Sequence, residues 1–195
     1  MENKKIKILQ FICSTGFYGA ERWVLALASH LPKDKTVSLL ATTLEDNSQD
    51  LELVRQFKDR CGATFELPMK HKFDFSVVDQ LAELIKREDI DIIHTHGYKS
   101  DILGVWAARK AGIPCVVTPH GFENAKDIKL RMFIWLGCQA MKYGDAIVPL
   151  SRQLLADMQR LGVKAEKTHY IQNGVDLSEV ESVRTDENIP ASTEK

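Results

Sequence analysis

Short apolar segments and longer amphipathic segments alternate along most of the 195-residue chain. The apolar segments have the length of buried strands, and the others carry apolar residues three and four positions apart, as helices packed on one side do. Strands are expected at residues 6–12, 36–43, 63–67, 92–95, 114–118, 146–150 and 168–171. Helices are expected at residues 20–31, 50–60, 75–87, 101–111, 128–143 and 152–161. This alternation predicts an α/β fold, a Rossmann-like, doubly wound, mostly parallel sheet with helices on both faces.

Composition and charge narrow the class of protein. The net charge of -1 gives no argument for a nucleic-acid partner. Four scattered cysteines without a CxxC pair favour reduced, buried thiols over a disulfide framework. No apolar run approaches the ~20 residues that cross a bilayer, so a cytoplasmic location is expected.

The stretch from residue 89 to residue 121 brings two histidine-bearing strand ends together. One predicted strand leads into His94-Thr95-His96-Gly97 and the next into Thr118-Pro119-His120-Gly121. With a helix between them, the two strands form a βαβ unit and end at the same edge of the sheet, where open α/β sheets bind ligands. The side chains expected at that edge are those of His94, His96, Tyr98, Lys99 and His120.

The three histidines are open to different interpretations. His94 is expected to be a packed, hydrogen-bonded core residue, whereas His96 lies beyond the predicted strand end and is expected to face a ligand. Residues two apart on a strand share a face, so His94 and His96, with His120 alongside, are an alternative metal site. Only Asp91 and Asp101 lie nearby as carboxylates, and no metal is expected.

Two further turns precede predicted helices. Gly16 and Gly19 follow the first strand, where helix N–H groups can bind an anion, although a plain tight turn is an equal alternative. Two glycines fall short of the three in GxGxxG, which disfavours a nicotinamide dinucleotide. Ser151 is interpreted as an N-cap because a GxSxG nucleophile elbow is missing around it.

Basic residues surround the apolar run of residues 132–136. Such a helix is typical of segments that lie on a membrane surface, and ordinary core packing with solvated charges is the favoured alternative. The basic residues are Lys126, Lys129, Arg131 and Lys142.

Five motifs occur in a characteristic order along the chain. They are GFYGAER at 16–22, DIIHTHG at 91–97, TPHG at 118–121, DAIVPLS at 145–151 and IQNGVD at 171–176. Together they resemble the N-terminal half of family 4 glycosyltransferases, also called glycosyl transferase group 1. The resemblance implies a GT-B architecture, in which two Rossmann-like domains face a cleft. Residues 1–177 would be the acceptor-side domain and 178–195 a linker or disordered tail, with the C-terminal donor-binding domain absent.

The resemblance also implies an activity. Family members move a sugar, with retention of configuration, from a nucleotide-sugar donor to a glycan, lipid-linked or small-molecule acceptor, usually without a metal and without a further cofactor. Envelope polysaccharide or glycolipid synthesis, with peripheral contact at the inner face of the membrane, is the family-level expectation. By motif, His120 would contact the donor sugar near the reacting carbon. The other expected roles are acceptor contacts for His96, Tyr98 and Lys99, proximity to the donor phosphates for Gly16 and Gly19, and the interdomain crossing for Asn173 and Gly174.

The sequence departs from the family because the donor-binding half is missing. Charge on a departing diphosphate needs preorganised cations or donors, so the chain is expected to fold but not to turn over alone. The alternatives are a stand-alone acceptor- or partner-binding module, a metal-dependent hydrolase using His94, His96 and His120, and a sugar-nucleotide epimerase. A face left open by the missing domain is expected to favour self-association. The apolar residues expected on it are Phe17, Tyr18, Tyr98 and Phe122.

Overall fold

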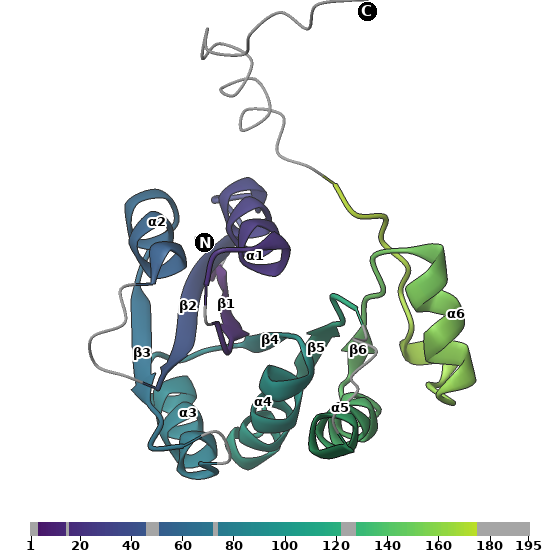
Figure 1. Ribbon diagram of the computed structural model, residues 1–195. Coiled ribbons are helices and arrows are strands. Elements are labelled where there is room, and N and C mark those ends of the chain that lie inside the picture. Colours follow the sequence, from purple (N-terminus) through teal and green to yellow (C-terminus); the bar gives the residue numbers. More distant parts are fainter. Residues whose placement is uncertain (1–3, 15, 46–50, 72–73, 122–127, 175–195) are drawn as a thin grey trace, which may run out of the picture.

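A computed structural model describes residues 4–14, 16–45, 51–71, 74–121 and 128–174 of the chain (Figure 1). These residues form one sheet of six parallel strands in the order β3-β2-β1-β4-β5-β6. The order reverses between β1 and β4, which is the doubly wound arrangement predicted from the sequence. The strands are β1 (Ile6–Ile12), β2 (Thr36–Leu44), β3 (Thr64–Pro68), β4 (Ile92–His96), β5 (Cys115–Thr118) and β6 (Ala146–Ile147).

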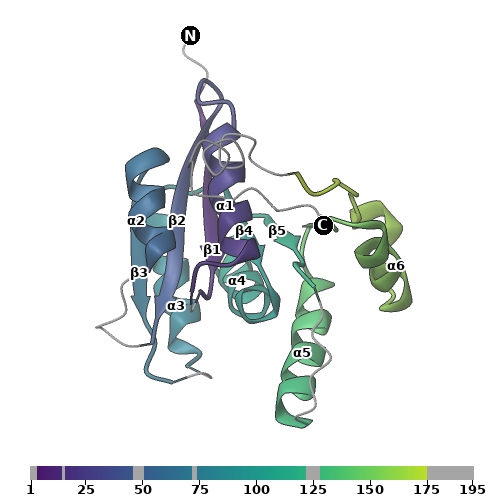
Figure 2. The ribbon, with the colours of Figure 1, turned by 45° about the horizontal axis from the view of Figure 1, so that its top comes forward.

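Helices cover both faces of the sheet. Figures 1 and 2 show α1 and α2 on one face, α3, α4 and α5 on the other, and α6 beyond β6 at the sheet edge. Ser151 caps α6 as predicted, since its Oγ accepts a hydrogen bond from the Leu154 amide at 3.1 Å. The helices are α1 (Gly19–His30), α2 (Glu52–Arg60), α3 (Ser76–Arg87), α4 (Tyr98–Ala111), α5 (Ile128–Met141) and α6 (Arg152–Arg160), followed by a 3₁₀ turn at Ala165–Lys167.

Alternate strand residues supply two apolar layers. Ile12 and Leu40 point toward Val24 of α1 and Phe57 of α2 in the smaller layer. The larger layer lies under α3, α4 and α5 and takes the opposite strand positions, including Leu9, Phe11, Ile93 and Val117. The four cysteines are free thiols; Cys115 and Cys138 are buried in the larger layer, whereas Cys13 and Cys61 are partly buried.

Glycine allows α4 to approach its neighbours closely. A Cβ on Gly104 would lie 2.3 Å from Cγ2 of Thr95, so α4 rests directly on β4 at this point. A Cβ on Gly137 of α5 would lie 2.5 Å from Cβ of Tyr98, at the first residue of α4. These two contacts fix the start of α4 beside the carboxyl end of β4.

The end of the described chain differs from the sequence prediction. Residues 168–171 were expected as a strand, but only Thr168 forms a β-bridge, with Ile147. β6 ends at Ile147 rather than Leu150 because Pro149 has no N–H to continue a ladder. The segment still runs beside β6, since the His169 amide donates to the Ile147 carbonyl at 2.8 Å. Residues 178–195, predicted as a tail, lie outside the described residues.

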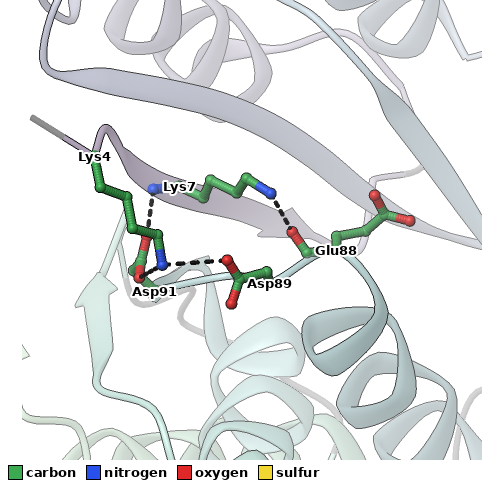
Figure 3. A network of polar contacts seen from close by, with 5 residues as sticks. All are labelled: Lys4, Lys7, Glu88, Asp89 and Asp91. Atoms are coloured by element: carbon green, nitrogen blue, oxygen red, sulfur yellow. Dashed lines mark hydrogen bonds and ion pairs between the residues drawn. The ribbon is translucent and has the colours of Figure 1, made fainter. Parts of the chain in front are cut away.

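A polar network joins β1 to the turn before β4 at the amino ends of the strands (Figure 3). The Asp91 carboxylate accepts a hydrogen bond from the Lys7 amide at 2.8 Å and pairs with the Lys4 ammonium at 3.4 Å. The Lys7 ammonium donates to the Glu88 carbonyl at 2.8 Å. The backbone hydrogen bond from Lys7, followed by the contact with Lys4, lowers the pKa of Asp91.

Replacing Asp91 with alanine is expected to lower the free energy of unfolding by roughly 1–2 kcal/mol, because the Lys7 amide loses a charged acceptor. The matched variant Lys4→Ala removes only exposed, solvent-screened ion pairs and should cost much less. Urea denaturation at pH 7 measures both values. Equal costs for the two variants would contradict this account of the network.

Candidate functional site

Three histidines meet where β4 and β5 end, on the face of the sheet covered by α1. The ring centroids of His94 and His96 lie 4.3 Å apart, and those of His96 and His120 lie 5.5 Å apart. Trp23 of α1 lies 5.4 to 6.0 Å from each of the three rings. The structure therefore brings together the histidines that the sequence placed at this edge.

Hydrogen bonds tie the cluster into the sheet. Nε2 of His94 lies 2.8 Å from Oγ1 of Thr118, and Nε2 of His96 lies 2.8 Å from Oε1 of Gln10 on β1. Nε2 of His120 lies 3.3 Å from Nδ1 of His96. The packed, hydrogen-bonded role predicted for His94 is confirmed.

The exposure predicted for His96 is wrong. His96 is the last residue of β4 rather than the first residue beyond it, and only 3% of its surface is exposed. It pairs in register with Ile12 of β1 and with Thr118 of β5, while Trp23 covers it from α1. Of the three histidines, His120 is the one that is only partly buried, so a ligand would reach His120 first.

The cluster lacks the arrangement of a metal site. The part of the chain that the structure describes holds no group of three or more His, Cys, Asp or Glu side chains able to bind a metal ion. Nε2 of His94 and Nε2 of His96 are directed at Thr118 and Gln10 on different strands, so they do not converge on one point. The metal-dependent hydrolase alternative therefore has no ligand set among these residues.

Burial keeps the three imidazoles neutral. It lowers the pKa of His94 to about 3 and that of His120 to about 4. Burial, reinforced by His94 and His120, also lowers the pKa of His96 well below its ordinary value. At neutral pH each ring therefore carries one proton and can both donate and accept a hydrogen bond.

On the opposite face of β4 lies a second buried titratable group, Asp101 of α4. Its carboxyl accepts a hydrogen bond from Oγ1 of Thr95 at 2.7 Å. Burial raises the pKa of Asp101 to about 8, only partly countered by that hydrogen bond. The side chains of His94 and His96 therefore point to the face of the sheet under α1, and that of Thr95 points to the other face, toward Asp101.

The glycine turn after β1 is closed by a carboxylate. Glu21 accepts hydrogen bonds from the Tyr18 amide at 3.0 Å and from Oγ of Ser14 at 2.9 Å. A Cβ on Gly16 would lie 2.4 Å from the Tyr18 ring, whereas one on Gly19 would meet nothing within 4 Å. Glu21 thus occupies the beginning of α1, and phosphate binding by this turn stays a prediction.

The remaining predicted site residues lie around the same edge. The Lys99 ammonium pairs with the Glu45 carboxylate at 2.5 Å, just past β2. Tyr98 is partly buried against the core and Gly137. Asn173 and Gly174 are exposed. The backbone N–H of Asn173 donates a hydrogen bond to the Leu150 carbonyl at 2.9 Å. Among the described residues, no contact links Lys99, Asn173 or Gly174 to the histidines, and the roles of all four residues stay predictions.

Three residues of the site were missed in the sequence. Gln10 could have been noticed as a polar residue inside the otherwise apolar end of β1. Glu21 follows Tyr18 by three residues, which is the spacing of a capping box. Trp23 gave no signal, because a partly buried aromatic residue on a helix is ordinary core packing.

Comparison with known proteins identifies the family to which this chain belongs. Residues 17–179 match the family model described as Glycosyltransferase Family 4. The chain belongs to glycosyltransferase family 4. All five sequence motifs of the resemblance lie within or overlap this matched range.

Several known proteins are similar to this family 4 chain. An *Escherichia coli* UDP-Gal:alpha-D-GlcNAc-diphosphoundecaprenol alpha-1,3-galactosyltransferase is 40% identical over 110 residues, covering 53% of this chain and 28% of the relative. The crystal structure of *Anabaena* HepE in complex with UDP superposes with a TM-score of 0.70 at 17% identity, over 92% of this chain and 49% of that one. The crystal structure of Neisseria meningitidis UDP-GlcNAc 2-epimerase bound to UDP-GlcNAc superposes with a TM-score of 0.69 at 12% identity. The match covers 93% of this chain and 51% of the epimerase chain.

The structural matches establish the Rossmann-like half of a GT-B fold, and the family match separates this chain from the epimerases. The family 4 chain spans about half the length of these solved relatives and just over a quarter of the curated one. Within the described residues, no helix is long and apolar enough to cross a membrane.

Lowering the pH from 7 to 5 is expected to destabilise the protein by a few kcal/mol. The pKa of each histidine is lower in the folded protein than the value of about 6.5 in an unfolded chain, so the unfolded chain takes up protons first as the pH falls. Asp101 opposes this trend, because its raised pKa makes the folded protein bind an extra proton. The stability lost through the three histidines is larger than the stability gained through the one carboxyl group. Urea denaturation midpoints at pH 7, 6 and 5 measure the net effect. Unchanged midpoints would contradict neutral buried imidazoles.

Raising the pH from 7 to 9 tests Asp101 together with the thiols of Cys13, Cys115 and Cys138, because burial also raises their pKa values and adds to the alkaline loss of stability. The folded pKa of Asp101, about 8, lies above the unfolded value, so stability is lost as the pH rises through 8, by about 1 kcal/mol. The variant Asp101→Asn should lack the part of the alkaline loss that comes from Asp101, should keep the part from the thiols, and should show a steeper fall between pH 7 and pH 5. Asp79→Asn, at an exposed ion pair, is the control and should follow the wild type. An alkaline profile of Asp101→Asn identical to the wild type would refute a protonated Asp101.

Proposed function

We propose that this chain is the acceptor-side half of a retaining glycosyltransferase that moves a sugar from a nucleotide sugar to a lipid-linked acceptor. The observation that carries the proposal is the 40% identity over 110 residues with the *E. coli* galactosyltransferase. The name of that relative describes UDP-galactose as donor and GlcNAc-diphosphoundecaprenol as acceptor. Envelope polysaccharide or glycolipid synthesis is the corresponding process.

His120 is the residue proposed to touch the reacting sugar. In the transfer, the acceptor oxygen bonds to the anomeric carbon, the bond from that carbon to the diphosphate oxygen breaks, and the proton of the acceptor hydroxyl passes to the departing diphosphate. A neutral imidazole at the partly exposed end of β5 can hydrogen-bond a sugar hydroxyl without adding charge. No metal is assigned to the site.

The departing diphosphate needs groups beyond this domain. Lys99 is already paired with Glu45, and the Glu21 carboxylate occupies the beginning of α1. Preorganised cations or N–H donors from a second domain would have to stabilise the developing charge. We therefore propose that this chain alone binds the acceptor without turnover.

Titration calorimetry tests the assignment with a short-chain prenyl-diphosphate GlcNAc compound and, separately, with UDP-galactose. The acceptor compound is expected to bind, and His120→Ala should weaken it by about tenfold through loss of one hydrogen bond. His30→Ala, at an exposed histidine on α1, is the matched control and should bind as the wild type does. Tight UDP-galactose binding without acceptor binding would mean that the two halves have been assigned the wrong way round.

A lipid-linked acceptor also gives a role to an apolar stripe on α5. Ile128, Met132, Trp135 and Leu136 are 79%, 60%, 57% and 42% exposed and follow helical spacing along one side of α5. We call these four residues the α5 outer face. The opposite side of α5 is buried in the core through Ile134, Cys138 and Met141. The favoured prediction of ordinary core packing therefore holds for one side of α5 only.

The α5 outer face combines aromatic and basic residues, since it includes Trp135 and lies next to Arg131. Arg131 of α5 is exposed, and α5 contains no Asp or Glu. Tryptophan with a flanking arginine is typical of surfaces that bind an anionic lipid interface. Peripheral membrane contact through the α5 outer face is thus part of the proposed function; Lys126 lies outside the described residues.

Vesicle sedimentation tests this contact. Phosphatidylglycerol vesicles are expected to bind the protein more tightly than phosphatidylcholine vesicles. The double variant Met132→Ser and Trp135→Ser should lose at least about tenfold in affinity because two large apolar side chains no longer enter the lipid. Phe75→Ser, at an exposed aromatic residue before α3, is the control.

Light scattering without vesicles separates membrane contact from self-association. If the wild type dimerises and fails to bind vesicles while the double variant stays monomeric, the α5 outer face binds a second copy of the chain instead of a membrane. Self-association through Phe17, Tyr18, Tyr98 and Phe122 stays a separate prediction. Tyr18 is well exposed, Phe17 and Tyr98 are partly buried, and Phe122 lies outside the described residues.

A further inference from the structure

A buried chain of hydrogen bonds leads from the middle of β1 to His120. Gln10 is fully buried on β1, and its Oε1 lies 2.8 Å from Nε2 of His96 at the end of β4. Nδ1 of His96 lies 3.3 Å from Nε2 of His120. Both nitrogens of the His96 ring are therefore engaged, one toward the interior of the sheet and one toward the predicted sugar contact.

With Oε1 of Gln10 facing His96, as in this structure, the proton count along this chain has one solution. Burial disfavours the charged form of both rings, so each ring carries a single proton. An amide oxygen can only accept a hydrogen bond, which places the proton of His96 on Nε2 and leaves a lone pair on Nδ1. Because that lone pair faces Nε2 of His120, the proton of His120 belongs on Nε2, and Nδ1 of His120 carries the lone pair.

We propose that Gln10 and His96 are positioning residues that hold His120 in one tautomer and one orientation. The proposal rests on the proposed function in so far as His120 contacts the reacting sugar. Its consequence is that Nδ1 of His120 is the hydrogen-bond acceptor offered to a sugar hydroxyl. Neither Gln10 nor His96 needs to touch the substrate, which is consistent with their burial.

The surroundings favour a single arrangement of the chain. Trp23 packs against the rings of His96 and His120, and Thr118 holds the neighbouring His94. Nε2 of Gln10 has no hydrogen-bond partner among the described residues, although it is buried. An unpaired buried donor is destabilising, so an apolar side chain at position 10 would remove this penalty. A role in orienting His96 accounts for a glutamine at that position.

The ¹⁵N NMR signals of the histidine rings test the proposal directly, because they distinguish a proton on Nδ1 from one on Nε2. In the wild type, His96 and His120 are both expected as the Nε2–H tautomer. Gln10→Leu should convert His120 to a mixture of tautomers and weaken binding of the prenyl-diphosphate GlcNAc compound by about tenfold. Gln10→Glu retains an acceptor and should restore the Nε2–H tautomer of His120. Thr42→Val is the control, since the buried Oγ1 of Thr42 has no partner among the described residues.

Two results would overturn the proposal. One is an Nδ1–H tautomer for either ring in the wild type, and the other is a Gln10→Leu spectrum identical to that of the wild type. If Gln10→Leu does not fold, the wild-type tautomers and the Gln10→Glu spectrum decide the question. The tautomers are measured without any substrate. If they are as expected and the wild type does not bind the acceptor compound, the proposed function fails while the positioning role stands.

Discussion

The parallel pairing of β1 with β4 is the contact on which the rest of the molecule depends. It is the point where the strand order reverses, and polar side chains hold it at both ends. At the amino ends the Lys7 amide donates to Asp91, and at the carboxyl ends Gln10 meets His96. A change in this register would separate both pairs at once. The sheet therefore sets the positions of His94 and His96, and His120 follows two residues after the end of β5.

β4 carries an unusual density of titratable groups for a central strand. His94 and His96 face α1, and Thr95 between them binds the carboxyl of Asp101 on the other face. Each of these groups is buried and is held in its neutral form, the histidines by lowered pKa values and the aspartic acid by a raised one. Because the shifts have opposite signs, acid and alkali both destabilise the fold. The protein is thus most stable near neutral pH, where the cluster is neutral and hydrogen-bonded throughout.

Most of the fold could be predicted from the sequence because strand and helix periodicities are strong in this chain. Those periodicities put His94, His96 and His120 at one edge, and the structure confirms it. The burial of His96 could not be predicted, since it depends on Trp23 of a distant helix lying over the strand end. Residues 168–171 were predicted as a strand from their local pattern, but only Thr168 forms a β-bridge. The neighbouring strand β6 is shortened by Pro149, so it offers too few partners for a full strand. Both errors come from contacts between elements, which periodicity along the chain does not contain.

Charge divides the surface of this domain in a way that matches the proposed acceptor. At the strand ends the imidazoles are neutral, and the charge of Lys99 is paired with that of Glu45. Glu21 accepts hydrogen bonds there and supplies no positive charge. Such an edge suits an uncharged sugar ring better than a diphosphate. The exposed arginine of α5 lies instead beside the apolar α5 outer face. A lipid-linked sugar has the same division, with a neutral sugar, an anionic diphosphate and an apolar chain. The two surfaces together therefore support the proposed lipid-linked acceptor more strongly than either does alone.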